Sequence, residues 1–439
     1  MNIAFTGNHG RTALFKAVSD ILAQSGHTAR WIATGSREMF SILKSVPPER
    51  VLDVSVFSDT DENALAELEK HSLLTVDAII SADRIIRHKP RSLALAYISS
   101  AYNNLYRFLT DGGVSLVFGE ATWAHEIVTA AVCSAMGIPF LSPVNVRYPS
   151  DRFAFFEGAG QECFVQTGVP DISAGQRLYR EFSGRRPFYM ERGSRGVAGP
   201  FIRHAYRHLT GDTADLTVPS LYSLIKDGVL KRLPRRKHGG VPEGRYVYLP
   251  LQCSPESSLD VLGWRHADQT EFVRSVSRAL PAGFKLAVKE HPLRVSSLYS
   301  KLKNIPAAVM TDADSHELIK GASAVVSVSG TACYEAGLYG VPAVTFSDLF
   351  FNVLPTVFRC RSFDEFGTVL ERAVNAEHDE KAVTAFLAKL HAGSFEGFAE
   401  SEHIYRGALL PDNVTKVALA FRKVIECYSS SKSTTADSM

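Results

Sequence analysis

Short β-rich runs alternate with longer helical patterns along most of the chain, and this alternation constrains the fold more than any other feature. In the first half, strands are predicted at 3–6, 28–32, 77–81, 114–118 and 138–141, and helices at 14–23 and 124–136. In the second half, strands are predicted at 246–250, 285–289, 307–310, 324–329 and 343–346, and helices at 270–280, 332–338 and 413–427. This βαβ rhythm predicts an α/β protein built on open parallel sheets.

The length of the chain predicts more than one domain. It has 439 residues, and about 150 residues per domain is the usual expectation. With 45% hydrophobic and 21% charged residues, the composition is that of a globular protein rather than a disordered or fibrous one. We expect two Rossmann-like doubly wound domains facing a cleft, with these parts: a first domain at 1–205, a basic linker region at 206–240, a second domain at 241–411, a closing helix at 412–428 and a disordered polar tail at 429–439.

Positive charge is concentrated in the middle of the chain. The net charge is only +2, yet residues 176–237 contain 14 Lys or Arg against 5 Asp or Glu. A solvated linker is one interpretation, and attachment to an anionic membrane surface or a polyanionic acceptor is the other. We expect no nucleic-acid partner.

The location predicted from the sequence is cytoplasmic, with peripheral attachment to the inner membrane face left open. The start of the chain has no basic cluster ahead of its apolar stretch, so it does not resemble a secretory signal. The longest uncharged stretch, 127–146, is interrupted by Gly137, Pro139 and Pro143, which favours a helix, a turn and a strand over a membrane span. The six cysteines are widely spaced, which favours reduced thiols and gives no metal-ligand pattern.

The segment Lys289, Glu290, His291 and Pro292 follows a predicted strand directly. In open α/β sheets ligands bind beyond the carboxyl ends of the strands, so Lys289 and His291 are candidates for contact with a phosphate. An ordinary strand-end turn with a structural histidine is the alternative for this tetrapeptide taken alone.

The segment Ser329, Gly330 and Thr331 runs from another predicted strand into a helix that also carries Glu335. A helix N-terminus favours an anion, the two hydroxyls add donors, and glycine lets the backbone approach a phosphate. Glu335 is a candidate for accepting ribose hydroxyls. The alternatives are a plain helix N-cap and an exposed helix glutamate.

In the first half, Glu120 follows a predicted strand and is a candidate general base or nucleophile toward a sugar, with His125 and Glu126 just beyond it. The loop of Gly7, Asn8 and His9 follows the first strand and is a candidate for contact with the acceptor or donor. It lacks the full GxGxxG pattern, which argues against dinucleotide binding.

Several segments, in order, resemble the bacterial capsule polysaccharide biosynthesis family, which includes the Kdo transferases of capsule assembly. They are FGEATWAHEIVTAAVCSAMGIPFLSP and RYPSDRFAFFEG in the first half, and YVYLPLQCSPESS, VKEHP and DSHELIKGASAVVSVSGTACYEAGLYGVPAVTF in the second. The resemblance implies a GT-B fold whose second domain holds a nucleotide-sugar donor and whose first domain holds the acceptor and a catalytic carboxylate.

The same resemblance assigns roles to individual residues. His291 and Pro292 match the family's HP motif, Ser329 and Thr331 its phosphate loop, Glu335 its helix carboxylate, and Glu120 its acidic strand end. Taken together with the strand-end positions, this makes Glu120 and His291 the expected catalytic residues. Nucleotide-sugar contacts are expected from Lys289, His291, Pro292, Ser329, Gly330, Thr331 and Glu335. No cofactor or metal is expected.

The expected function is therefore transfer of a sugar, with Kdo from a CMP-sugar favoured, onto a growing capsular or other surface polysaccharide or its glycolipid acceptor. UDP- and GDP-sugar donors stay open. The alternatives are a polyol-phosphate transferase of the teichoic-acid type, a nucleotide-sugar epimerase, and a non-catalytic polysaccharide assembly subunit that kept the scaffold.

Overall fold

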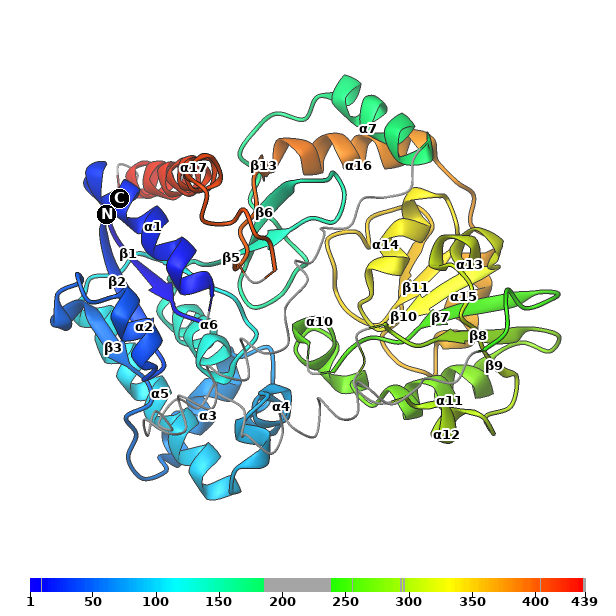
Figure 1. Cartoon of the computed structure of the whole chain (residues 1–439), viewed down its shortest axis with the longest axis horizontal. Helices are drawn as coiled ribbons and strands as arrows, with labels where there is room; N and C mark the ends of the chain where they lie inside the picture. The colour runs from blue at the N-terminus through cyan, green and yellow to red at the C-terminus, as the bar shows by residue number, and fades with distance from the viewer. Residues whose placement is uncertain are drawn as a thin grey trace. The chain divides into compact units, whose positions relative to one another are not determined.

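The chain folds into two compact units, each built on its own sheet (Figure 1). The computed structural model describes residues 1–8, 10–184, 238–254, 256–292, 294, 297–402 and 404–436. Of these, unit 1 contains 1–169 and 391–436, and unit 2 contains 170–184 and 238–390.

The sheet of unit 1 has seven strands in the order β13-β6-β5-β4-β1-β2-β3. Their bounds are β1 Asn2–Thr6, β2 Thr28–Ala33, β3 Val51–Asp53, β4 Leu116–Phe118, β5 Phe140–Asn145, β6 Arg152–Glu157 and β13 Ser394–Glu396. The run from β3 to β5 is parallel, whereas β6 pairs antiparallel with β5 and with β13. The order β3-β2-β1-β4-β5 is that of a Rossmann-like half, in which the chain changes direction between β1 and β4.

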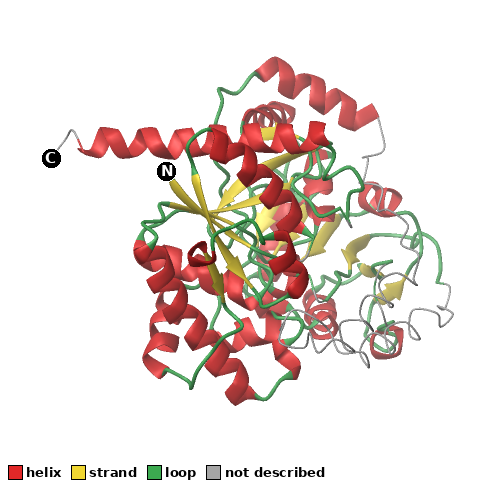
Figure 2. Ribbon diagram, turned by 60° about the vertical axis from the view of Figure 1, so that its left-hand side comes forward, coloured by secondary structure: helices red, strands yellow, loops and turns green. Residues whose placement is uncertain are grey.

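Helices cover the sheet of unit 1 on both sides (Figure 2). Parallel strands are buried on both faces, and β1 and β4 accordingly consist almost entirely of buried residues. The helices are α1 Arg11–Gln24, α2 Arg37–Ile42, α3 Glu62–His71, α4 Val76–Ala82, α5 Arg91–Asp111, α6 Ala124–Met136 and α17 Pro411–Ala436, with short 3-10 turns η1 Pro48–Arg50 and η2 Ile86–His88.

Aromatic packing joins the two ends of the chain inside unit 1. Phe421 on α17 is fully buried, and its ring lies 4.6 Å from that of Phe118 and 4.8 Å from that of Phe155, centroid to centroid. The rings of Phe5 and Phe15 lie 6.0 and 5.8 Å from it. Helix α17 is therefore part of the core of unit 1.

The sheet of unit 2 has six parallel strands in the order β12-β11-β10-β7-β8-β9. Their bounds are β7 Tyr246–Pro250, β8 Lys285–Lys289, β9 Ala308–Met310, β10 Ala324–Ser327, β11 Ala343–Thr345 and β12 Val357–Arg359. The helices are α7 Ile172–Gly184, α10 Ser257–Asp260, α11 Gln269–Ala279, α12 Tyr299–Leu302, α13 Ser315–Gly321, α14 Thr331–Leu338, α15 Phe366–Val374 and α16 Glu380–Ala392, with the 3-10 turn η3 Trp264–His266. This is again a doubly wound order, which changes direction between β7 and β10.

Helix α7 belongs to unit 2 although the first half of the chain supplies it. It packs on α16 so closely that a Cβ added to Gly175 would lie 2.2 Å from the carbonyl oxygen of Thr384. Only glycine permits this backbone approach.

The prediction of an α/β protein with two doubly wound units is confirmed by the two sheets. The strand predicted at 77–81 is wrong, because these residues lie in α4. The Thr75 hydroxyl accepts a hydrogen bond from the backbone N–H of Ala78 at 3.2 Å and caps this helix, a start signal that the strand assignment overlooked.

The boundaries of the units differ from the predicted ones at three places. Helix α7 belongs to unit 2, although it lies within the predicted first domain at 1–205. The chain returns to unit 1 at His391, ahead of the predicted boundary at residue 412, and α17 continues to Ala436, into the predicted polar tail. Most of the predicted basic linker region, residues 206–237, lies outside the described residues.

The packing of α17 gives a testable prediction. Phe421→Ala should lower the free energy of unfolding by about 3 to 5 kcal/mol in urea denaturation, because it opens a cavity between four aromatic rings. Leu419→Ala on the same helix is the control, since Leu419 is 49% exposed and should cost less than about 1 kcal/mol. Equal losses in the two variants would contradict the placement of α17 in the core.

Candidate functional site

Two clusters of polar side chains lie at carboxyl ends of central strands, one in each unit. The unit 2 cluster consists of Gln252, Cys253, Lys289, His291, Arg294 and Ser329. The unit 1 cluster consists of Asn8, Arg11, Glu120, Glu126 and Glu400. Each lies where the strand order changes direction, the usual place for a ligand in an open α/β sheet.

Gln252, which follows β7, connects two loops of unit 2. Its side-chain carbonyl oxygen accepts hydrogen bonds from the Ser327 hydroxyl and the Ser329 backbone N–H, both at 3.2 Å. Its amide nitrogen donates to the Ser329 hydroxyl at 2.9 Å, and that hydroxyl also donates to the carbonyl of Ser258. The Ser329 side chain therefore braces the loop that precedes α14.

Helix α14 begins at Thr331, after Gly330, without a side-chain cap. By contrast, Asp61, Asp268 and Asp314 cap α3, α11 and α13 with their carboxylates. A Cβ on Gly330 would lie 2.5 Å from the Ser327 hydroxyl oxygen, so a larger residue here would displace the Ser327 side chain. The start of α14 thus presents backbone N–H groups beside an exposed Thr331.

Three cationic or ionisable groups lie at or just after the end of β8, the neighbour of β7 in the sheet. The Lys289 ammonium donates to the Ala313 carbonyl at 2.7 Å and to the Ser315 hydroxyl at 3.0 Å. Nδ1 of His291 lies 2.9 Å from the Cys253 sulfur. The Arg294 guanidinium donates to the Gln252 carbonyl at 2.9 Å, and burial lowers the pKa of Arg294. Pro292, which comes directly after His291, is exposed and lies in a turn.

Glu335 is buried, with 5% of its surface exposed. Its Oε2 lies 3.7 Å from Nδ1 of His316 on α13. The alternative of an exposed helix glutamate is therefore wrong. A carboxylate buried this deeply needs a charged or hydrogen-bonding partner, and His316 is in place to supply one.

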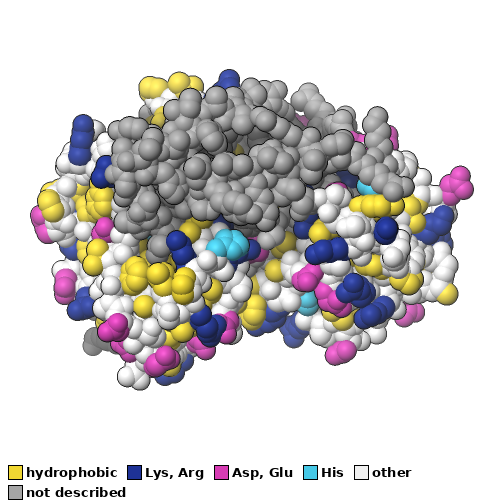
Figure 3. Space-filling view, turned by 60° about the horizontal axis from the view of Figure 1, so that its bottom comes forward, with side chains coloured by type: hydrophobic (Ala, Val, Ile, Leu, Met, Phe, Trp, Pro, Cys, Tyr) yellow, Lys and Arg dark blue, Asp and Glu magenta, His cyan; other side chains and the backbone are white. Residues whose placement is uncertain are grey.

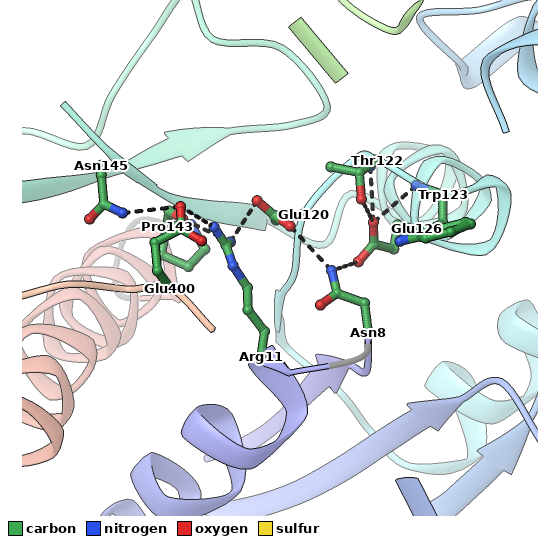
Figure 4. Close-up of polar contacts among 9 residues, drawn as sticks. All are labelled: Asn8, Arg11, Glu120, Thr122, Trp123, Glu126, Pro143, Asn145 and Glu400. Carbon is green, nitrogen blue, oxygen red and sulfur yellow. Dashed lines mark hydrogen bonds and ion pairs between the residues drawn. The ribbon is translucent and has the colours of Figure 1, made fainter. Parts of the chain in front are cut away.

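In unit 1, Glu120 is held from two sides (Figure 4). Its Oε1 lies 2.7 Å from the Arg11 guanidinium, and its Oε2 accepts a hydrogen bond from the Asn8 amide at 3.1 Å. The same amide donates to Oε1 of Glu126 at 2.8 Å. Arg11 also contacts Glu400 at 2.9 Å.

The electrostatic surroundings leave Glu120 able to exchange a proton near neutral pH. Burial, together with the charges of Glu400 and Glu126, raises the pKa of Glu120 to about 7, against the opposing effects of Arg11 and Asn8. Burial also raises the pKa of Glu126. The Glu120 side chain remains 21% exposed, so a ligand can reach it.

The loop after β1 contributes Asn8 directly to this cluster. Gly7 supports it from behind, because its carbonyl contacts Nε2 of His125 at 3.1 Å and its N–H donates to the carbonyl of Ile32 at 2.8 Å. His9 lies outside the described residues.

Sequence reasoning missed several residues that complete the two clusters. Gln252 and Cys253 lie two and three residues beyond the end of β7, so inspection of every strand end would have found them. Arg11 opens the first helix, where a cation is unfavourable next to the helix dipole unless carboxylates compensate, and this was an available signal. Nothing local marks Glu400.

No protein-family model and no curated protein matches the chain. Solved structures that match include a β-Kdo 2,7-transferase, KpsC of Thermosulfurimonas dismutans, at 11% identity over 73% of this chain and 89% of that one, with a TM-score of 0.35. A UDP-GlcNAc 2-epimerase from Neisseria meningitidis bound to UDP-GlcNAc matches at 8% identity over 89% and 98%, with a TM-score of 0.30. The spinosyn rhamnosyltransferase SpnG matches at 11% identity over 89% and 95%, with a TM-score of 0.27. Likeness at these identities and scores carries no functional conclusion.

Proposed function

We propose that the chain is a glycosyltransferase of the GT-B type that moves a sugar from a nucleotide donor to a surface polysaccharide or its lipid acceptor. The observation that carries the proposal is the opposite character of the two strand-end clusters. The unit 2 cluster is rich in cationic and N–H donor groups, whereas the unit 1 cluster presents the carboxylate of Glu120, whose pKa lies near neutrality.

The donor nucleotide is assigned to unit 2. Its phosphate would lie at the uncapped start of α14, where backbone N–H groups and Thr331 meet an anion, with Lys289 and His291 adding charge. Ser329 and Gly330 hold the shape of the turn, and Glu335 lies one turn into the helix. A CMP-sugar, with Kdo as the sugar, is the favoured donor because His291 and Pro292 resemble the HP motif.

The acceptor and the proton transfer are assigned to unit 1. The acceptor hydroxyl oxygen forms a bond to the anomeric carbon, and the bond from that carbon to the phosphate oxygen breaks. The nucleotide leaves with the electron pair, and Glu120 takes the hydroxyl proton. A base works best when its pKa lies near the working pH, and that of Glu120 does.

Peripheral attachment to an anionic membrane is a further part of the proposal, resting on the basic composition of residues 176–237. Most of those residues lie outside the part of the chain that the structure describes. Within the described part, no helix is long and apolar enough to cross a bilayer. On the face drawn in Figure 3, the charged side chains that are described are of both signs and intermingled. Failure to cosediment with anionic vesicles at low salt would remove this part.

Replacing Glu120 tests the proton transfer. Glu120→Gln keeps the size of the side chain but not its basicity, so turnover should fall by about 100-fold or more while donor affinity stays within about twofold. The control is Glu162→Gln, at an exposed glutamate of the same unit, which should be neutral. Near-normal turnover in folded Glu120→Gln protein would move the search to Glu126.

Cys253 provides a direct test of the donor site, because its sulfur contacts His291. Nucleotide at about 100 times its dissociation constant should slow alkylation of Cys253 by iodoacetamide by about 10-fold or more. Peptide mass spectrometry would measure this, with the exposed Cys163 and Cys427 as internal controls whose rates stay constant. Equal labelling of Cys253 with and without each of CMP, CDP, UDP and GDP would place the nucleotide elsewhere.

A further inference from the structure

We propose that Arg11, shared between Glu120 and Glu400, is a positioning residue that sets the orientation and charge of Glu120, so that the segment following β13 completes the acid/base site. The inference rests on the proposed role of Glu120. It adds Arg11 and Glu400 to the site, neither of which touches the reacting atoms.

Arg11 is placed to act on two carboxylates at once. It is the first residue of α1 and is 4% exposed. Its Nη1 lies 2.7 Å from Glu120, its Nη2 lies 2.9 Å from Glu400, and Nη1 also donates to the carbonyl of Pro143 at 3.3 Å. A planar guanidinium with these contacts has little freedom to turn, so it fixes the carboxylate of Glu120.

Glu400 is itself held in place. Its Oε1 accepts a hydrogen bond from the Asn145 amide, at the end of β5, at 3.1 Å (Figure 4). Its side chain is 13% exposed, so water screens its charge only weakly. Glu400 therefore competes with Glu120 for one cation at close range.

The other oxygen of Glu120 is fixed through Glu126. Asn8 donates to both glutamates, and Oε2 of Glu126 accepts from the N–H and hydroxyl of Thr122 and the N–H of Trp123. Each oxygen of Glu120 thus meets a donor whose own position is fixed. Rotation of the Glu120 carboxylate would break contacts on both sides.

The charges make the inference testable. Among the described residues, the charged groups that act on Glu120 are Arg11, Glu400 and Glu126. Without Glu400, Glu120 is the one carboxylate of the described residues that remains in an ion pair with Arg11, and the ionised form of Glu120 is favoured. Without Arg11, a buried carboxylate has lost its cation and the protonated form is favoured. The two changes break the same Arg11–Glu400 ion pair yet act on Glu120 in opposite directions.

The experiment is a carbon NMR titration of protein with isotope-labelled glutamate carboxyls, in which the resonance lost in Glu120→Gln identifies Glu120. The titration midpoint of the Glu120 carboxyl, near 7 in the wild type, should rise by about one to three pH units in Arg11→Gln. It should fall by at least about half a unit in Glu400→Gln. Arg11→Lys retains the charge and should lie between the wild type and Arg11→Gln. The control is Glu396→Gln, at an exposed glutamate 3.8 Å from Arg152, which should change nothing.

Midpoints of Glu120 that move in opposite directions in Arg11→Gln and Glu400→Gln support the inference. In a plot of turnover against pH, the ascending limb should move in the same direction as the midpoint in each variant. Midpoints that move in the same direction in the two variants, or unmoved midpoints, overturn the inference. If Arg11→Gln does not fold, the midpoints of Arg11→Lys and Glu400→Gln are compared instead, and they should again move in opposite directions. Full turnover in Glu120→Gln would instead defeat the catalytic role of Glu120 while leaving the opposite midpoints intact, so the two failures are distinguishable.

Discussion

Parallel strand pairing is the constraint on which the rest of this structure depends. It brings the carboxyl ends of β7, β8 and β10 to one edge of their sheet, and those of β1 and β4 to one edge of the other. Residues far apart in the sequence therefore become neighbours: Gln252 with Ser329, and Asn8 with Glu120. Both polar clusters lie where the strand order reverses, so each owes its position to topology and its chemistry to a few loop residues.

The return of the chain to unit 1 ties stability to the candidate chemistry. After His391 the chain forms β13 against β6, passes Glu400 beside Arg11 and enters α17, whose Phe421 is buried among the rings of the core. Aromatic burial stabilises the same unit that holds Glu120 and Glu400 against Arg11, with Glu126 joined to Glu120 through Asn8. Such a group of carboxylates is costly in a protein interior, which is consistent with a functional reason for keeping it.

Much of the architecture could be predicted because its signals are local. Strands β7 and β8 and helix α6 occur at their predicted bounds, since short, mostly buried apolar runs mark the two strands and Gly137 marks the end of the helix. The strand predicted at 77–81 failed because a short apolar run suits a helix equally well, and Thr75 decides between them. Glu400 could not be predicted, because its contact with Arg11 depends on how the chain returns across the sheet. The burial of Glu335 likewise depends on how α13 packs against α14.

Nucleotide binding at the unit 2 cluster is the central claim, and titration calorimetry tests it most directly. CMP, CDP, UDP and GDP would each be titrated into the wild type, His291→Gln and a control, His378→Gln, whose exposed histidine contacts Tyr179. The account predicts saturable binding of at least one nucleotide, weakened about 10-fold or more in His291→Gln and unchanged in the control. No binding of any of the four, or equal affinity in all three proteins, would contradict it.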